Sequence, residues 1–190
     1  HRFGLLKFNL SNFSSTDVIN NATFRAYLAS SAIDAGESYN VSVHRIYPNF
    51  SWTEETAAWN SSINTSYNTT ESNHINFTGS STTSIWYNWS VTDQVQTSVT
   101  NNLDNISFFV FAKNGTTNTV DDYLQFASKE HDTNETAKLE IGYTGNISIT
   151  ACTTLNQDGM TYKMTGNIMA SSTSNCMAIT GNDVTLDCQG

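Results

Sequence analysis

Asparagines that could carry sugar give the strongest chemical signal in this sequence. Asn followed two positions later by Ser or Thr is the acceptor signal for N-glycosylation. The chain has fourteen such signals, whereas 23 Asn in a chain with 50 Ser and Thr among 190 residues would give about six by chance. The signals lie at Asn9, Asn12, Asn21, Asn40, Asn49, Asn60, Asn64, Asn68, Asn76, Asn88, Asn105, Asn114, Asn134 and Asn146. An accident of composition is the alternative, but the excess favours an extracellular protein coated with N-linked glycans.

Residues that could perform catalysis are few and poorly spaced. The four His are His1, His44, His74 and His131, and none has metal-ligand spacing with another His or Cys. No Ser lies in a nucleophile-elbow motif. His44 alternates within a strand-like stretch and fits a surface or packed polar role better than that of a base. Glu54 and Glu55, which follow Trp52, fit packing and hydrogen bonding better than acid catalysis, so we expect no enzyme activity.

A cluster of carboxylates gives the sequence its one candidate cofactor site. Asp121 and Asp122 could ligate Ca²⁺ together with Glu130 or Asp132, because hard carboxylates clustered on loops suit that ion. Solvated loop charges are the alternative explanation. Structural Ca²⁺ is therefore the only cofactor that the sequence suggests, and its ligands stay unassigned.

A run of aromatic residues could form a platform for carbohydrate. In a strand, Trp86 and Asn88 would face one way and Tyr87 and Trp89 the other. A flat, exposed Trp can stack on the CH face of a sugar, whereas packing in the core is the alternative for each of these rings.

Composition narrows the classes of protein that remain. Charged residues make up 13% of the chain and the net charge is −9, with only 8 Lys and Arg, so a nucleic-acid surface is excluded. The longest apolar run, 108–112, is far shorter than the roughly 18 residues that span a membrane. A hydrophobic content of 38% is enough for a folded core, which excludes general disorder.

The elements that position these residues are short strands separated by polar turns. Strand patterns are predicted at 4–10, 22–28, 39–47, 85–91, 106–112, 123–127 and 137–143. One helix is predicted at 92–99, where Thr92 could cap and Val95 and Val99 share a face. Long connections are predicted at 29–38, 61–84 and 113–121. The pattern indicates an all-β sandwich.

The order of several motifs resembles the DNRLRE domain family, which is classed among carbohydrate-binding modules related to alginate-binding and disaggregatase proteins. The motifs are LLKFNL at 5–10, ATFRAYL at 22–28, VSVHRI at 41–46, WTEETAAWN at 52–60, WSVTDQVQ at 89–96, FASKE at 126–130 and KLEIGY at 138–143. The resemblance implies a jelly-roll β-sandwich over 1–145 on a secreted or surface protein. Family members begin with an additional strand, so the chain reads as a mature or partial one that lacks a signal peptide.

Residues 146–190 differ from the rest because they contain all three Cys and all four Met. The motifs ITACTTL at 149–155, MTYKMT at 160–165 and the stretch 176–190 are similar to the first coil of right-handed parallel β-helices in archaeal surface proteins. This resemblance implies a short β-helix-like segment with a disulfide between Cys152 and Cys176. Cys188 would pair between chains, pair with a Cys beyond residue 190, or be buried.

A single coil cannot bury its apolar face alone. We therefore expect 1–190 to be a fragment of a longer polypeptide, or to be completed by a neighbouring subunit.

Two functions follow from these features. The first is a non-catalytic structural subunit of an archaeal extracellular filament, appendage or surface layer, heavily N-glycosylated, adhesive, and self-associating into a homopolymer. In such a filament an open sheet edge would accept a strand from the next subunit. The alternative is a carbohydrate-binding module of a surface adhesin or polysaccharide-active enzyme, with polysaccharide as the partner.

Overall fold

The computed structural model describes residues 3–53, 66–69, 73–114, 122–128, 134–168 and 175–188. Strands dominate them, and one short helix, α1 (Thr92–Thr100), is present. The strands are β1 (Phe3–Asn9), β2 (Val18–Ala32), β3 (Ser38–Arg45), β4 (His74–Thr78), β5 (Ile85–Ser90), β6 (Asn105–Asn114), β7 (Tyr123–Phe126), β8 (Lys138–Thr144), β9 (Asn146–Ile149), β10 (Thr153–Leu155), β11 (Thr161–Met164), β12 (Met177–Ile179) and β13 (Thr185–Asp187). The predicted all-β class is confirmed.

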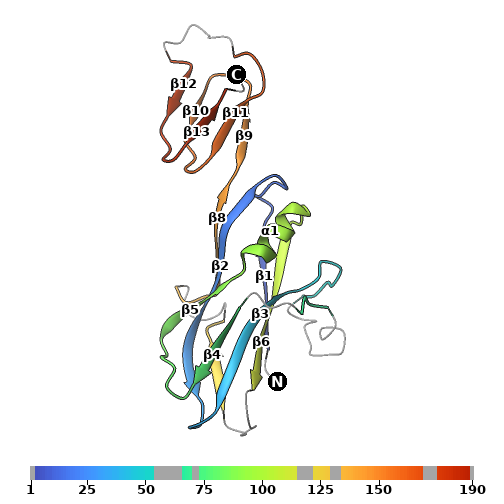
Figure 1. Ribbon diagram of the computed structural model, residues 1–190, viewed down its shortest axis with the longest axis vertical. Coiled ribbons are helices and arrows are strands. Elements are labelled where there is room, and N and C mark those ends of the chain that lie inside the picture. Colours follow the sequence, from blue (N-terminus) through green and yellow to red (C-terminus); the bar gives the residue numbers. More distant parts are fainter. Residues whose placement is uncertain are drawn as a thin grey trace.

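Two antiparallel sheets form the sandwich (Figure 1). The β6 sheet has the strand order β1-β6-β3-β4, and the β2 sheet contains β5, β2, β7 and β8. Strand β2 has fifteen residues and pairs with β5 along one edge. Its other edge is shared by two strands, because β8 pairs with 18–25 and β7 pairs with 28–32.

The core lies between the two sheets and follows from the alternation along β2. Every second residue from Ala22 to Leu28 is buried, and Phe24 has no exposed surface. The Phe24 ring lies 5.7 Å from Trp89 and 5.9 Å from Phe108, measured between ring centroids. The buried indole N–H of Trp89 donates to the backbone oxygen of Val41 at 3.0 Å, which removes the cost of burying that polar group.

The helix packs against the core but begins differently from the prediction. Val95 and Val99 are buried on one face, as predicted. The prediction that Thr92 caps the helix is wrong: Val91 occupies the N-cap position without a side-chain hydrogen bond. The Thr92 hydroxyl instead accepts the backbone N–H of Ala22 at 2.9 Å, so it satisfies a donor of β2.

All three predicted connections contain strand residues, and the third, 113–121, does so through the end of β6 at Asn114. Strand β4 lies within 61–84 and pairs with β3, placing Phe77 fully in the core. Strand β2 runs through Ala32 into the connection predicted at 29–38, because β7 pairs with its end beyond an irregularity between Leu28 and Ser30. Pairing across the sheet therefore imposes strand geometry where local propensity is weak.

The outer face of the β6 sheet is covered by the chain that follows β3. Phe50, Trp52 and Tyr67 pack with Phe109 and Phe111 in a second apolar cluster. His44 is buried beside this cluster; its Nε2 lies 2.9 Å from the Ser42 hydroxyl and its Nδ1 lies 2.9 Å from the backbone oxygen of Asn68. Of the two roles predicted for His44, the structure shows the packed polar one.

The C-terminal segment is built from parallel strands. Strands β9, β11 and β13 form one parallel sheet, and β10 and β12 form another, so successive passes of the chain lie side by side. Ile149, Leu155, Met160 and Tyr162 form its small core. The strands pair in parallel, and the β-helix that the sequence predicts here stays a prediction.

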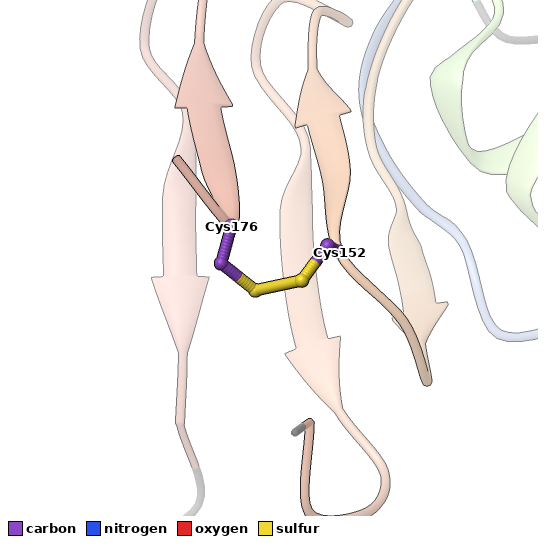
Figure 2. The surroundings of a disulfide bond; sticks show 2 residues. All are labelled: Cys152 and Cys176. Atoms are coloured by element: carbon purple, nitrogen blue, oxygen red, sulfur yellow. A yellow bond between two sulfur atoms is a disulfide. The ribbon is translucent and has the colours of Figure 1, made fainter. Parts of the chain in front are cut away.

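A disulfide joins two passes of this segment. It links Cys152 to Cys176, the residues directly before the paired strands β10 and β12 (Figure 2). This is the pairing that the sequence resemblance implied. Cys188 is exposed and unpaired in the described chain, so the predicted alternative of a buried Cys188 is wrong.

Strand β8 leads directly from the sandwich into the C-terminal segment (Figure 1). Tyr143 packs against the apolar clusters of both parts, and its ring lies 4.8 Å from that of Phe13. At the joint, a Cβ on Gly145 would lie 2.5 Å from Cε of Met160 and 3.2 Å from Oδ1 of Asp17. The absence of a side chain at Gly145 therefore lets the two parts pack closely.

The disulfide should contribute measurably to the stability of the C-terminal segment. Replacing both Cys152 and Cys176 by Ser should lower its free energy of unfolding by about 3 kcal/mol, since the cross-link spans a sequence separation of 24. Proteolysis in increasing urea, with products identified by mass, would measure this loss. The exposed Cys188→Ser variant is the control and should match the wild type. An equal urea midpoint for all three proteins would contradict the prediction.

A side chain at residue 145 should lower the stability of the contact between the two parts. Gly145→Ala should lower stability by about 1–2 kcal/mol, because Met160 must move from its buried position. Gly166→Ala is a matched control, since nothing lies within 4 Å of its added Cβ. Thermal unfolding monitored by circular dichroism would compare them, and equal midpoints for the two variants would refute the close packing.

Candidate carbohydrate-binding site

The outer face of the β2 sheet carries a group of aromatic and charged side chains, which we call the Trp86 platform. Its members point away from the core because they alternate with buried or partly buried residues on three neighbouring strands. They are Arg25 and Tyr27 on β2, Trp86 and Asn88 on β5, and Lys138 and Glu140 on β8. The pairing register places Tyr27 opposite Trp86 and Arg25 opposite both Asn88 and Lys138.

Trp86 lies at the centre of these contacts. The Tyr27 ring meets it edge-on at 5.5 Å between centroids. The ammonium of Lys138 lies 4.9 Å from the indole centroid, and the guanidinium of Arg25 lies 5.2 Å from it. Both separations are within the range of cation–π attraction. The half-buried indole is therefore held in place by its neighbours while part of it remains accessible.

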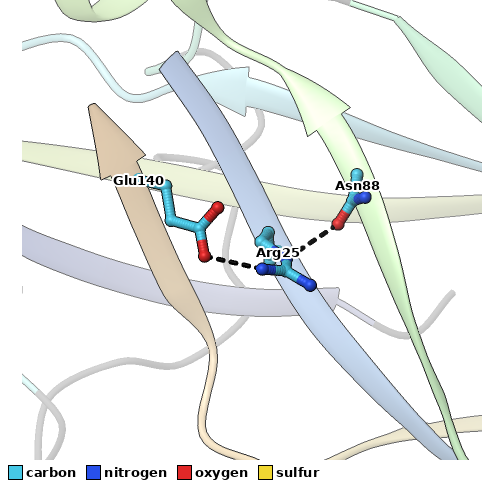
Figure 3. Close-up of polar contacts among 3 residues, drawn as sticks. All are labelled: Arg25, Asn88 and Glu140. Atoms are coloured by element: carbon cyan, nitrogen blue, oxygen red, sulfur yellow. Dashed lines mark hydrogen bonds and ion pairs between the residues drawn. The ribbon is translucent and has the colours of Figure 1, made fainter. Parts of the chain in front are cut away.

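A polar network orients the guanidinium of Arg25 (Figure 3). Its Nε donates to Oδ1 of Asn88 at 3.0 Å and its Nη1 donates to Oε1 of Glu140 at 2.6 Å. The Arg25 and Glu140 side chains are 29% and 54% exposed, so solvent screens their ion pair and it adds little to folding stability. The network's main effect is to fix donors and acceptors beside the indole.

This arrangement has the chemistry of a sugar-binding surface. The indole offers an apolar face for the CH groups of a pyranose ring, and such sites combine aromatic area with a few placed polar groups. Arg25 and Lys138 can donate hydrogen bonds to sugar oxygens, while Glu140 can accept from hydroxyls. Lys138 is exposed and flexible, so it can move as a sugar approaches the ring.

The other aromatic residues of this strand face inward. Trp89 is fully buried, and Tyr87 packs on Phe77 at 4.6 Å while its hydroxyl donates to the backbone oxygen of Thr82 at 2.8 Å. The predicted alternation is confirmed. Only Trp86 of the three is available as a platform.

The glycosylation signals lie on the surface wherever their side chains are described. Asn68 is half-buried, and the other such Asn are exposed. The exposed ones are Asn9, Asn12, Asn21, Asn40, Asn49, Asn76, Asn88, Asn105, Asn134 and Asn146. Asn60 and Asn64 lie outside the described residues, as does the side chain of Asn114. Described Asn without the signal are exposed too, so sugar attachment stays a prediction.

The candidate calcium ligands are only partly described. The Asp122 carboxylate accepts the backbone N–H of Asp34 and the hydroxyl of Tyr39, both at 3.0 Å, so it ties β7 to the turn before β3. Asp121, Glu130 and Asp132 lie outside the described residues, as do Glu54, Glu55, His1 and His131. Within the described ranges, no three metal-ligating side chains come together. The Ca²⁺ site stays a prediction.

Sequence reasoning named Trp86 among three candidate rings but missed its neighbours. The alternation of 22–28 placed Arg25 and Tyr27 on one face, yet nothing local showed that β5 and β8 flank β2. Lys138 and Glu140 lie more than 110 residues beyond Arg25 in the chain. The opposite charges of Arg25 in 22–28 and Glu140 in 138–143 are the sequence feature that could have suggested that these two strands are neighbours.

The antiparallel sandwich and its partly exposed aromatic face have the features expected of a carbohydrate-binding module. The chain belongs to carbohydrate-binding module family 96, whose family model matches residues 1–143. That match covers the whole sandwich except Thr144, the last residue of β8, and it includes every member of the Trp86 platform. No curated protein matches the chain. No helix in the described part of the chain is long and apolar enough to cross a membrane.

Proposed function

We propose that this chain binds carbohydrate through the Trp86 platform and performs no catalysis. The observation that carries the proposal is the family match, which spans the sandwich on which the platform lies. The location of the aromatic and polar groups supports it further. The outer face of the β6 sheet is covered by Phe50, Trp52 and Tyr67. On the platform, by contrast, Asn88, Lys138 and Glu140 are exposed and Trp86 is half-buried.

Binding at such a surface would combine stacking with hydrogen bonds. A sugar ring would lie against the exposed part of Trp86, and its hydroxyls would reach Arg25, Lys138 and Glu140. Because Arg25 is already oriented by Asn88 and Glu140, little conformational entropy would be lost there on binding.

Replacing the central ring should remove most of the affinity. Trp86→Ala should weaken binding at least about tenfold, equivalent to ~1.4 kcal/mol, because the stacking surface is lost. Affinity electrophoresis in gels containing laminarin, mannan, xylan or polygalacturonate would measure the change. Tyr47→Ala is the control, since Tyr47 is an exposed aromatic that follows β3 of the other sheet.

Two results would contradict the proposal in different ways. Unchanged mobility of Trp86→Ala would mean that sugar binds elsewhere on the sandwich. A folded wild type that no polysaccharide retards would argue against carbohydrate binding itself. Lys138→Ala provides a second test that leaves the half-buried indole in place, and it should also weaken retention.

We further propose that the protein is an extracellular, N-glycosylated structural subunit. The excess of glycosylation signals and their surface positions support this, as does the disulfide, which suits an oxidising location. In the described chain, β1, β4 and β5 each pair on one side only, which leaves edges that could accept a strand. The resemblance of 146–190 to the first coil of a β-helix provides the link to archaeal surface proteins.

Assembly should be visible directly. If edges join neighbouring subunits, electron microscopy of the native material should show ordered fibres or sheets. Material that consists of dispersed single particles at every protein concentration would refute the structural-subunit proposal while leaving carbohydrate binding intact.

A further inference from the structure

Two of the glycosylation signals lie on the same sheet face as the Trp86 platform. Asn88, Trp89 and Ser90 form one within β5, and Asn21, Ala22 and Thr23 form the other within β2. Asn88 is a member of the platform. Asn21 lies opposite Gly142 of β8, where an added Cβ would lie 2.7 Å from the Asn21 amide nitrogen.

Asn88 lies at the position nearest to the indole. It is two residues from Trp86 on the same face of the strand, a separation of about 7 Å. Asn21 is further away, since it precedes Arg25 by four residues of strand, or about 13 Å. The first sugar on Asn88 would therefore stand beside the indole, while a sugar on Asn21 would lie towards the far end of β2.

The hydrogen bonds of Asn88 leave its amide nitrogen available. Its Oδ1 accepts from Nε of Arg25, and Figure 3 shows the amide nitrogen on the side away from Arg25. Nδ2 is the atom to which an N-linked sugar is attached. Because Asn88 is exposed, a glycan can be added without breaking the bond to Arg25.

We propose that N-glycosylation of Asn88 closes the Trp86 platform to external polysaccharide. A glycan tethered within about 7 Å of the ring has a high effective concentration there, in the millimolar range for short flexible linkers. By contacting the ring and filling the space beside it, the glycan would compete with a polysaccharide from outside. The two forms of the protein then differ in function: the unmodified platform binds sugar, and the modified one presents a coated surface. This inference rests on the proposed carbohydrate binding.

Removal of single signals tests the inference. The full chain is made in a secretory host that N-glycosylates and in bacteria that do not, and glycopeptide mass spectrometry reports occupancy of Asn88. Ser90→Ala deletes the signal but keeps Asn88 and its bond to Arg25. Thr23→Ala, which deletes the signal of Asn21 on the same face, is the matched control, and Ser11→Ala deletes that of Asn9 at the end of β1.

Affinities are measured with laminarin, mannan, xylan and polygalacturonate. For each variant, the affinity of the glycosylated form is divided by the affinity of the unglycosylated form. Ser90→Ala should bind as tightly with glycans as without them. Wild type, Thr23→Ala and Ser11→Ala should each lose at least tenfold on glycosylation.

Equal binding by glycosylated wild type and Ser90→Ala would overturn the inference, whether Asn88 is found occupied or empty. Failure of folded, unglycosylated wild type to bind all four polysaccharides would instead overturn the proposed function.

Discussion

The alternation of side chains along β2 is the constraint on which both the core and the candidate site depend. Its inward residues, of which Phe24 is fully buried, hold the two sheets together. Its outward residues, Arg25 and Tyr27, are thereby fixed on the opposite face. A one-residue slip in register would exchange these two sets. The burial of Phe24 against Trp89 and Phe108 therefore also positions Arg25 beside Trp86.

Local pattern predicted the fold well wherever apolar residues alternate, and failed where pairing across the sheet decides the conformation. The strand at 22–28 and the buried face of α1 were readable because Phe24, Leu28, Val95 and Val99 follow the strand and helix periods. The end of β2, with Ser30 and Ser31, offers no such period and becomes strand only through β7. The role of Thr92 was missed for a similar reason, since its partner is a backbone amide 70 residues away.

The candidate site shows the same limit more sharply. The sequence could place Trp86 and Trp89 on opposite faces of one strand, but only the structure shows that Trp89 is the buried one. The partners of Trp86 could not be predicted, because Lys138 reaches Trp86 across the whole width of β2. That contact depends on β8 occupying the edge of β2 opposite β5, which is a property of the topology. Single residues of such a surface can be named from the sequence. Which of them lie together depends on the order of the strands in the sheet.

Low charge and many glycosylation signals have a joint consequence for this surface. A chain with 13% charged residues has few ionic groups to keep a sheet face hydrated, and three of them, Arg25, Lys138 and Glu140, lie around Trp86. The outer face of the β6 sheet is instead shielded from water, because Trp52 and Tyr67 cover it. The β2 sheet keeps part of its aromatic ring accessible. Under the two proposals made above, that ring would contact either a polysaccharide from outside or a glycan attached at Asn88.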